Sequence, residues 1–149
     1  MAEPKTITTR RHRQYGTVAY RLSPAGPLVL LVTSRETRRW VIPKGWPMKG
    51  RKPHKAAAIE AFEEAGVVGR VRNKPLGTFS YAKVKPQGIM PCSVKVFPLK
   101  VREVHDEWPE SGERERCWFS PEDAATLVSE PGLAELLRSF NPTRAAKAR

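Results

Sequence analysis

Three carboxylates in one short segment are the residues of this sequence best suited to chemistry. The segment at 50–69 reads GRKPHKAAAIEAFEEAGVVG and contains Glu60, Glu63 and Glu64, the only acidic residues between positions 37 and 102. Within a chain of net charge +12, three neighbouring negative charges call for a partner. A divalent cation is one such partner, because Mg²⁺ in proteins takes one or two carboxylates and keeps further positions for water and substrate phosphate oxygens.

The spacing of the three glutamates predicts that a helix presents them. The window 53–65 begins with a proline, which suits the first helical position, and Gly66 follows at the usual place for a C-terminal cap. On a period of 3.6 residues the apolar and acidic side chains fall on opposite sides, with Ala58, Ala61, Phe62 and Ala65 against Glu60, Glu63 and Glu64. We therefore expect one helix face on a core and the other at a surface or cleft.

Basic residues surround the start of this helix. Eight lysines and arginines lie between positions 35 and 55 against one acid, Glu36. Such a surface favours a polyanionic partner, either a phosphorylated small molecule or nucleic acid. Carboxylates for a metal ion beside bases for phosphate oxygens form the combination that a phosphoanhydride hydrolase needs. A solvated helix face is the alternative, because like charges on an exposed helix cost only roughly 0.2–0.5 kcal/mol per pair.

Alternating patterns and apolar runs predict a single α/β domain in this chain of 149 residues. We expect strands at 14–22, 28–34 and 38–45, broken strands within 67–84, and further strands at 92–104 and 116–120. Two more helices are expected at 120–129 and 131–140. The folded domain is expected at 14–140, between a basic N-terminal arm at 1–13 and a basic C-terminal tail at 141–149.

Nothing in the sequence has the apolar length that a membrane span requires, so no membrane partner is expected. The first residues, MAEPKTITTRRHRQ, have no apolar core of the kind that a secretory signal contains. Two cysteines in such a chain, Cys92 and Cys117, are expected to stay reduced. We therefore expect a cytoplasmic protein.

The segment GWPMKGRKPHKAAAIEAFEEAGV resembles the signature of the Nudix hydrolases, G-x5-E-x7-R-E-U-x-E-E-x-G-U, in which U is apolar. Gly45 matches the first glycine, and Glu60, Glu63, Glu64 and Gly66 match the end of the signature without a gap. The flanking segments VLLVTSRETRRWVIPKG and EVHDEWPESGERERCWFSPEDA resemble the diphosphoinositol-polyphosphate and diadenosine-polyphosphate branch of that family.

This resemblance implies a fold, a reaction and a cofactor. The fold would be an α/β/α sandwich of the Nudix type, with a mixed β-sheet and the catalytic helix at about 53–65. The reaction would be hydrolysis of a phosphoanhydride bond, dependent on Mg²⁺ or Mn²⁺. Its substrates would be phosphorylated small molecules, namely dinucleoside polyphosphates, nucleoside triphosphates or diphosphoinositol polyphosphates.

The resemblance also implies roles for individual residues. Glu63 and Glu64 would bind the metal with a backbone carbonyl near Lys44 or Gly45, and Glu60 would bind metal or take a proton from the attacking water. A carboxylate outside the helix would assist, with Glu113 and Glu115 as candidates. The bases expected to hold substrate phosphate are Arg13, Arg35, Arg39, Lys44 and Arg51.

Two positions depart from the signature, since Arg51 replaces its first glutamate and Ile59 replaces its arginine. At position 59 an arginine would lie one turn before Glu63 and share the negative charge. Either another base takes that part, with Arg51, Lys44 and Arg39 as candidates, or the metal does so alone, or catalysis has decayed. A Nudix fold that binds RNA or another polyanion without cleaving it is therefore one alternative function, and hydrolysis at RNA 5′ ends is another. Trp46 and Trp108, in expected loops, are candidates for stacking on a base.

Overall fold

The computed structural model describes residues 11–143, and its strands form one mixed sheet. In chain order the strands are β1 (His12–Ser23), β2 (Gly26–Thr33), β3 (Trp40–Val41), β4 (Lys44–Gly45), β5 (Val67–Val71), β6 (Gly77–Lys85), β7 (Gly88–Val104) and β8 (Arg116–Phe119). The helices are α1 (Pro53–Ala65), α2 (Pro121–Leu127) and α3 (Pro131–Arg138). β1 begins inside the segment expected to be an arm, and most of that arm and of the C-terminal tail lies outside the described residues.

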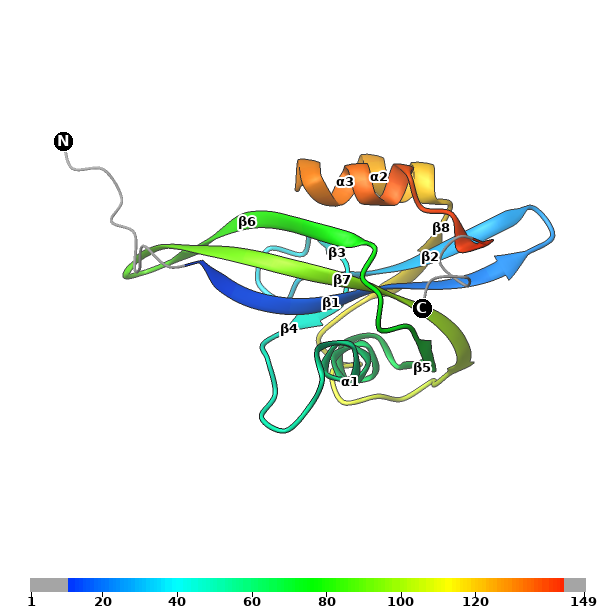
Figure 1. The fold of residues 1–149 in the computed structure, drawn as a ribbon, viewed down its shortest axis with the longest axis horizontal. Coiled ribbons are helices and arrows are strands. Elements are labelled where there is room, and N and C mark those ends of the chain that lie inside the picture. Colours follow the sequence, from blue (N-terminus) through cyan, green and yellow to red (C-terminus); the bar gives the residue numbers. More distant parts are fainter. Residues whose placement is uncertain (1–10, 144–149) are drawn as a thin grey trace.

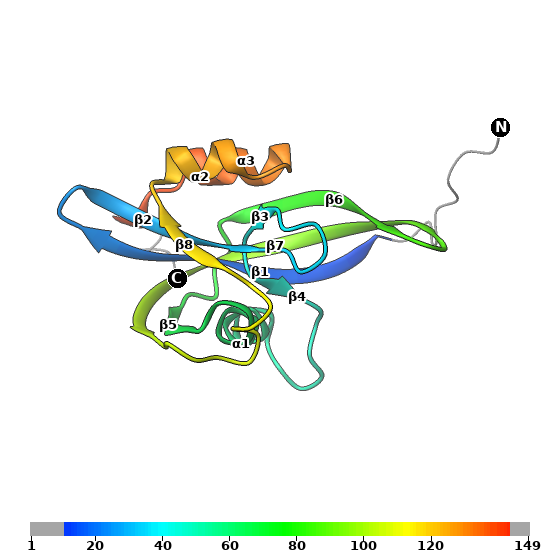
Figure 2. The same cartoon turned by 180° about the vertical axis from the view of Figure 1, so that it is seen from behind.

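The centre of the sheet is a parallel pair formed by β1 and β7. Their register runs from His12 opposite Cys92 to Tyr20 opposite Lys100. The main strand order is β3-β2-β1-β7-β5, with β4 paired to β1, β6 to β7 and β8 to β2, all antiparallel. Helix α1 covers one face of this sheet, and α2 and α3 cover the other (Figures 1 and 2). The expected α/β/α sandwich with a mixed sheet is confirmed.

Apolar side chains of the inner strands fill both spaces between sheet and helices. Val29 and Leu31 of β2 belong to the cluster that packs against α2 and α3. Leu30 and Val32, which alternate with them, belong to the cluster that contains Ala61 of α1. Successive side chains of a strand point to opposite faces of a sheet, so a strand covered on both sides needs a continuous apolar run. This requirement explains the segment LVLLV at 28–32.

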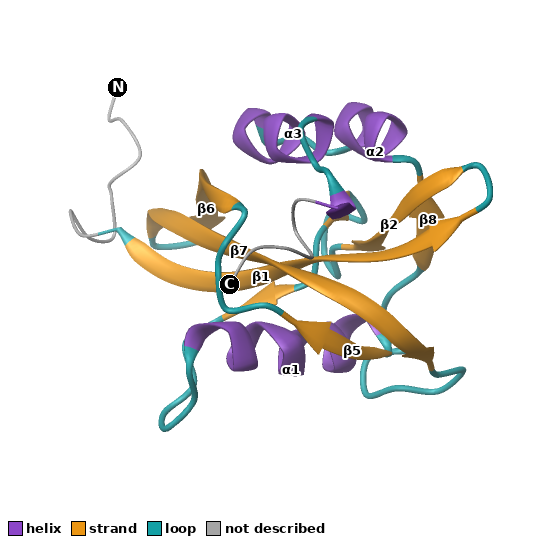
Figure 3. Cartoon of the chain, turned by 45° about the vertical axis from the view of Figure 1, so that its right-hand side comes forward, coloured by secondary structure: helices purple, strands orange, loops and turns teal. Residues whose placement is uncertain are grey.

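Helix α1 begins and ends where the sequence predicted. Pro53 occupies its first turn, and Gly66 adopts a left-handed φ of 70° while its N–H donates to the Phe62 carbonyl. A Cβ at Gly66 would also lie within 3 Å of the Trp108 and Arg116 side chains. Glycine is therefore required here by backbone conformation and by packing. The position of α1 beneath the sheet, beside β5, is clearest in Figure 3.

The expected strand at 38–45 is in fact two short strands, β3 and β4. They are separated by Ile42 and Pro43, and proline has no N–H to donate to a sheet. The Pro43 carbonyl instead accepts a hydrogen bond from the Thr17 amide of β1 at 3.1 Å. This break turns Lys44 and Gly45 onto β1, beside the carboxylates of α1.

Candidate active site

A cleft of about 470 Å³ opens beside α1. Its walls come from β1, β3, β4 and β6, the loop at 34–39, α1, the loop at 105–115 and the residue before α3. Its charged lining residues are Arg35, Glu36, Arg39, Lys44, Glu60, Glu64, Lys83, Glu110, Arg114 and Glu130. Acids and bases thus meet in one cavity.

Glu60 and Glu64 are the two helix carboxylates that line this cleft. The carboxylate of Glu60 lies so close to Gly45 that a Cβ there would collide with it. Oε1 of Glu64 accepts a hydrogen bond from the Lys44 backbone N–H at 3.3 Å. Burial raises the pKa of each carboxyl to about 7, and repulsion from Glu63 adds to the effect at Glu60. Both groups are therefore poised to take up a cation or a proton near neutral pH.

The expectation of one apolar and one acidic helix face needs a correction at Glu64. Only 8% of Glu64 is exposed, so it lies on the buried side of α1 with Ala61 and Ala65. Helical periodicity alone could not show this, because the groups that accompany the carboxylate into the interior come from other parts of the chain. The glutamate lies in the core because charged partners meet it there.

Glu63 has a different position from its two neighbours. Its side chain is half-buried and does not line the cleft, while its backbone carbonyl accepts a hydrogen bond from the Glu110 amide at 3.1 Å. Within residues 11–143, no three His, Cys, Asp or Glu side chains are grouped so as to hold a metal ion. The structure thus brings together Glu60, Glu64 and the backbone at Gly45, and the assignment of Glu63 as a ligand stays a prediction.

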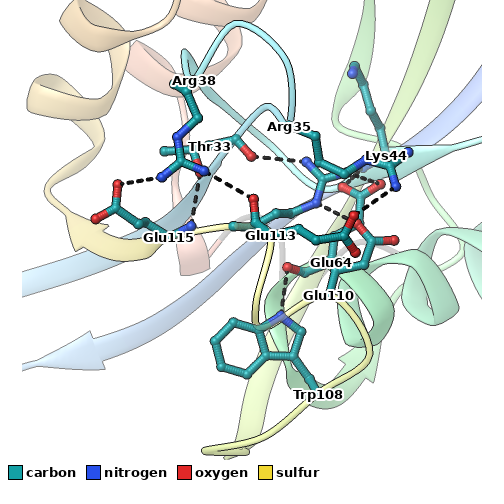
Figure 4. Close-up of polar contacts among 10 residues, drawn as sticks. Thr33, Arg35, Arg38, Lys44, Glu64, Trp108, Glu110, Glu113 and Glu115 are labelled. Carbon is teal, nitrogen blue, oxygen red and sulfur yellow. Dashed lines mark hydrogen bonds and ion pairs between the residues drawn. The ribbon is translucent and has the colours of Figure 1, made fainter.

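Arg114 provides the buried positive charge beside these carboxylates, and the sequence interpretation missed it. Its side chain is 9% exposed, with Nη2 at 3.6 Å from Glu64 Oε2 and Nε at 2.5 Å from Glu110 Oε1. Nη1 donates to the Thr33 carbonyl at 3.0 Å. Figure 4 shows two of the acceptors of these contacts, Glu64 and Glu110, close together beside α1. Ile59 cannot provide a positive charge for the carboxylates. Arg114, 55 positions further along the chain, provides it instead.

A weak signal for Arg114 is present in the sequence. The stretch ERER at 113–116 alternates acid and base and runs into the strand expected at 116–120. Glu113 and Glu115 point to one side, where they pair with Arg35 at 3.4 Å and Arg38 at 3.2 Å. Arg114 lies on the other side, in the cleft. Neither of the two predicted assisting carboxylates lines the cleft, whereas Glu110 does.

Lys44 links the carboxylates of α1 to the rest of the cleft. Burial lowers the pKa of its ammonium group, while the carboxylates of Glu64 and Glu130 act in the opposite direction. Its Nζ lies 5.0 Å from the centre of the Tyr81 ring. A second cation thus interacts electrostatically with Glu64, from one of the three residues that the sequence proposed in place of the missing arginine.

The other predicted phosphate-binding residues divide into two groups. Arg35 and Arg39 line the cleft with Lys44, whereas Arg13 and Arg51 are exposed and do not. Lys83, which the sequence did not single out, also lines it, with Nζ at 5.6 Å from the centre of the Trp46 ring. Trp46 is 40% exposed at the cleft wall, so it remains a candidate for stacking on a base.

The loop at 105–115 is fastened to the C-terminal end of α1. Trp108 Nε1 donates to the Glu64 carbonyl at 3.0 Å, and Arg116 Nη1 donates to the Ala65 carbonyl at 2.8 Å. The Arg116 guanidinium also lies 3.9 Å from the centre of the Trp108 ring. Helix ends leave carbonyls without helical partners, and this loop and the first residue of β8 supply donors for them. Trp108 therefore holds the loop and does not line the cleft.

In the described part of the chain, no helix has the length and apolar character needed to cross a membrane. The NUDIX domain family matches residues 12–140. Nudix hydrolase 12, mitochondrial, from Arabidopsis thaliana is 34% identical over 116 residues, which are 75% of this chain and 57% of that protein. Diphosphoinositol polyphosphate phosphohydrolase 3-beta from Bos taurus is 31% identical over 127 residues, 83% of this chain and 74% of its own. The chain spans somewhat more than half the length of the first curated relatives it matches.

Solved structures agree on the fold. The crystal structure of the C. elegans Ap4A hydrolase superposes with a TM-score of 0.63 at 21% identity, covering 91% of this chain and 100% of that one. A NUDIX hydrolase from Nitrosomonas europaea superposes with a TM-score of 0.70 at 13% identity, covering 91% and 92%. At these identities the structural likeness shows the fold alone. With the family match over 129 of its positions, from 12 to 140, the chain belongs to the NUDIX domain family.

Proposed function

We propose that this protein is a metal-dependent hydrolase that cleaves phosphoanhydride bonds in highly phosphorylated small molecules. The observation that carries the proposal is the placement of Glu60 against Gly45 and of Glu64 against the Lys44 amide, in a cleft that also contains Arg35 and Arg39. Relatives named as diphosphoinositol polyphosphate phosphohydrolases support this substrate class, as does the structural likeness to an Ap4A hydrolase. The substrates are dinucleoside polyphosphates, nucleoside triphosphates or diphosphoinositol polyphosphates.

The residues present fit Mg²⁺ or Mn²⁺. Both ions favour carboxylate and carbonyl oxygens, and Mg²⁺ needs only one or two carboxylates from the protein. Glu60, Glu64 and the Gly45 backbone provide that set, and the close approach of Glu60 to Gly45 leaves no room for a larger residue. When bound, a divalent ion polarises phosphoryl oxygens and neutralises charge on them.

The chain's own side chains have separate tasks in this reaction. Arg35, Arg39 and Lys44 hold phosphate oxygens and keep the phosphorus in line with the attacking water. Glu60 either helps to hold the ion or, where Glu64 and the Gly45 carbonyl hold it, takes the proton of that water as its oxygen bonds to phosphorus and the bridging P–O bond breaks. Arg114 touches Glu64 and Glu110 and so holds the carboxylates in position.

Hydrolysis of diadenosine tetraphosphate, ATP and 5′-triphosphate RNA, each with Mg²⁺ or EDTA, tests the proposal. Glu60→Gln and Glu64→Gln should each lower kcat at least tenfold, because each removes a charge that the transition state requires. Glu63→Gln tests the signature's third glutamate in the same assay. Glu107→Gln, an exposed acid of the neighbouring loop, is the matched control and should leave the rate unchanged. Full turnover in EDTA, or in both of the first two variants, would contradict the proposal.

The second candidate is a polyanion-binding module that recognises RNA, or a hydrolase of RNA 5′ ends. The net charge of +12 favours it. Its other support, the missing signature arginine, is weaker because Arg114 occupies the carboxylate site. RNA that binds tightly and leaves the assay uncut would favour the binding module, and release of pyrophosphate from its 5′ end would favour the RNA hydrolase. The cytoplasmic location stays a prediction.

A further inference from the structure

Glu130 is a buried acid in the cleft that the proposed reaction does not use. It directly precedes α3, is 8% exposed and lines the cavity. Its Oε2 lies 3.5 Å from Arg39 Nη1. Among the described residues, its Oε1 has no hydrogen-bond partner. A buried acceptor without a donor costs roughly 1–3 kcal/mol, so such an atom in a residue that lines a cavity indicates a missing partner.

The carboxylate has no task in the helix that follows it. Glu130 stands at the N-cap of α3, yet its side chain makes no capping hydrogen bond. The single ion pair to Arg39 uses Oε2 and leaves Oε1 without a role. A purely structural glutamate at this place would place both oxygens on protein donors. The Glu130 carboxylate therefore has a role in the cleft and not in capping α3.

The surroundings of Glu130 are polar and contain donors as well as this acceptor. The Tyr81 hydroxyl donates to Gln14 Oε1 at 2.6 Å, and both residues line the cleft. Lys44 and Arg39 are the nearby cations. A hydroxyl group donates one hydrogen bond and accepts others, so it suits a carboxylate oxygen that lies beside cations. A phosphate group carries only acceptors when it is fully ionised, and it would meet Oε1 with like charge.

We propose that Glu130 forms a hydroxyl-binding subsite, in which its incompletely partnered carboxylate accepts a hydrogen bond from an unphosphorylated hydroxyl of the substrate. The donor is either a sugar hydroxyl of a nucleotide or a free ring hydroxyl of a partly phosphorylated inositol. The cleft then has two binding regions. The carboxylates of α1 and the bases bind the phosphoanhydride, and Glu130 binds the group attached to it. This inference rests on the proposed function for the placement of phosphate, and it adds the chemistry of what the phosphate is attached to.

Binding of uncleavable ligands in Mg²⁺, measured by calorimetry, tests the subsite. The first pair of probes is α,β-methylene-ADP and its 2′,3′-dideoxy counterpart. The second pair is inositol trisphosphate, which has free hydroxyls, and inositol hexakisphosphate, which has none. Glu130→Gln should weaken the hydroxyl-bearing member of one pair about tenfold, because a charge-assisted hydrogen bond becomes a neutral one. The member without hydroxyls should bind as well or more tightly, because a negative charge has gone.

The pair that shows this contrast identifies the source of the hydroxyl. Glu130→Met removes both oxygens and should give a larger contrast of the same sign, and melting midpoints check that both variants fold. Glu135→Gln, the same change at an exposed position of α3, is the control and should show no contrast. Changes on Glu130→Gln that are equal for probes with and without hydroxyls, in both pairs, would overturn the subsite. No probe is hydrolysed, so the binding contrast does not depend on catalysis. Absence of phosphohydrolase activity would therefore count only against the proposed reaction.

Discussion

At the scale of single residues, the site is a balance between buried charges. Glu64 and Arg114 are both about nine-tenths buried, and Glu110 joins them through the Arg114 Nε. Removing one member of a buried charge group leaves the others without compensation, which costs more than the group itself contributes. The signature arginine is thus absent from position 59, but Arg114 provides a cation beside the carboxylates in the folded structure.

Replacement of Arg114 tests this balance. Arg114→Met should lower the free energy of unfolding by roughly 3–5 kcal/mol, because Glu64 and Glu110 stay buried without their cation. Arg114→Lys should lose less, since it keeps the charge but not the planar fork that reaches three acceptors. Urea unfolding measures both. Arg38→Met removes the exposed partner of Glu115 and should cost at most about 1 kcal/mol. If Arg114→Met and Arg38→Met lowered the free energy of unfolding by similar amounts, the buried ion pairs of Arg114 would contribute no more to stability than an exposed ion pair.

The raised pKa values predict how stability depends on pH. Glu60 and Glu64 titrate near 7 when folded, against 4.5 for a free glutamate, so between these values the folded protein binds more protons than the unfolded chain. Stability of the metal-free protein contributed by these groups should therefore fall as pH rises from about 4.5 to about 7. The measurement is the unfolding free energy in EDTA at pH 5, 6, 7 and 8, compared with Glu64→Gln, in which the fall should be smaller. Mg²⁺ should stabilise the protein most at the upper end of this range. Parallel curves for the two proteins would contradict the assignment.

At the scale of elements, the site depends on the contact between α1 and the loop at 105–115. The last carbonyls of α1 receive donors from Trp108, Glu110 and Arg116. The same loop carries Glu110 and Arg114 into the cleft. Capping the helix and assembling the charges therefore depend on the same segment of the chain.

Trp108→Phe tests this coupling by keeping an aromatic ring and removing the indole N–H. Loss of one hydrogen bond to the Glu64 carbonyl should cost about 0.5–1.5 kcal/mol. The loop should then open more often, so amide hydrogen exchange should rise at 105–115 and phosphohydrolase activity should fall several-fold. Hydrogen exchange read by mass spectrometry locates the effect, with the β6–β7 hairpin as the internal reference. Exchange that rises equally in hairpin and loop would indicate general destabilisation and not a specific role of the loop.

The sequence predicted elements well where their limits are coded locally. Pro53 and Gly66 fixed both ends of α1 within their own segment. Pro43 divides β3 from β4 through contacts with β1, and the pattern at 38–45 could not show them. The partner of Glu64 was missed for a similar reason, because a charged residue in an acidic loop resembles a solvated one until the loop is folded onto the helix. Side chains whose partners are distant in sequence were therefore the ones placed wrongly or not at all.

At the scale of the whole molecule, the positive charge is distributed unevenly. The net charge is +12, yet the charged side chains lining the cleft comprise five bases and five acids. The lining bases are Arg35, Arg39, Lys44, Lys83 and Arg114, and the acids are Glu36, Glu60, Glu64, Glu110 and Glu130. The excess positive charge therefore lies outside the cleft, where it can attract a polyanion from a distance and where salt screens it.

This distribution predicts the dependence of catalysis on phosphate number and salt. Dinucleotides linked by four or five phosphates, or an inositol pyrophosphate, should have a higher kcat/KM than ADP-ribose, because each phosphate adds charge for the surrounding bases. The ratio should be largest at low ionic strength and should shrink at physiological salt. Measuring kcat/KM for these substrates at both salts decides the matter. Preference for ADP-ribose at both would assign the basic surface to another partner, and nucleic acid would then be the first to test.

The parallel pair at the centre of the sheet also determines when the protein can fold. His12 of β1 pairs opposite Cys92 of β7, so the middle of the sheet cannot close until the chain has been synthesised beyond residue 104. Until then α1 is an isolated helix of 13 residues, a length that is marginally stable in water. The loop with Arg114 follows β7 directly, and Glu130 comes later still. A nascent chain that ends before β7 therefore contains the signature segment but no assembled cleft, and fold and site form together only once β7, the loop after it and Glu130 have been synthesised.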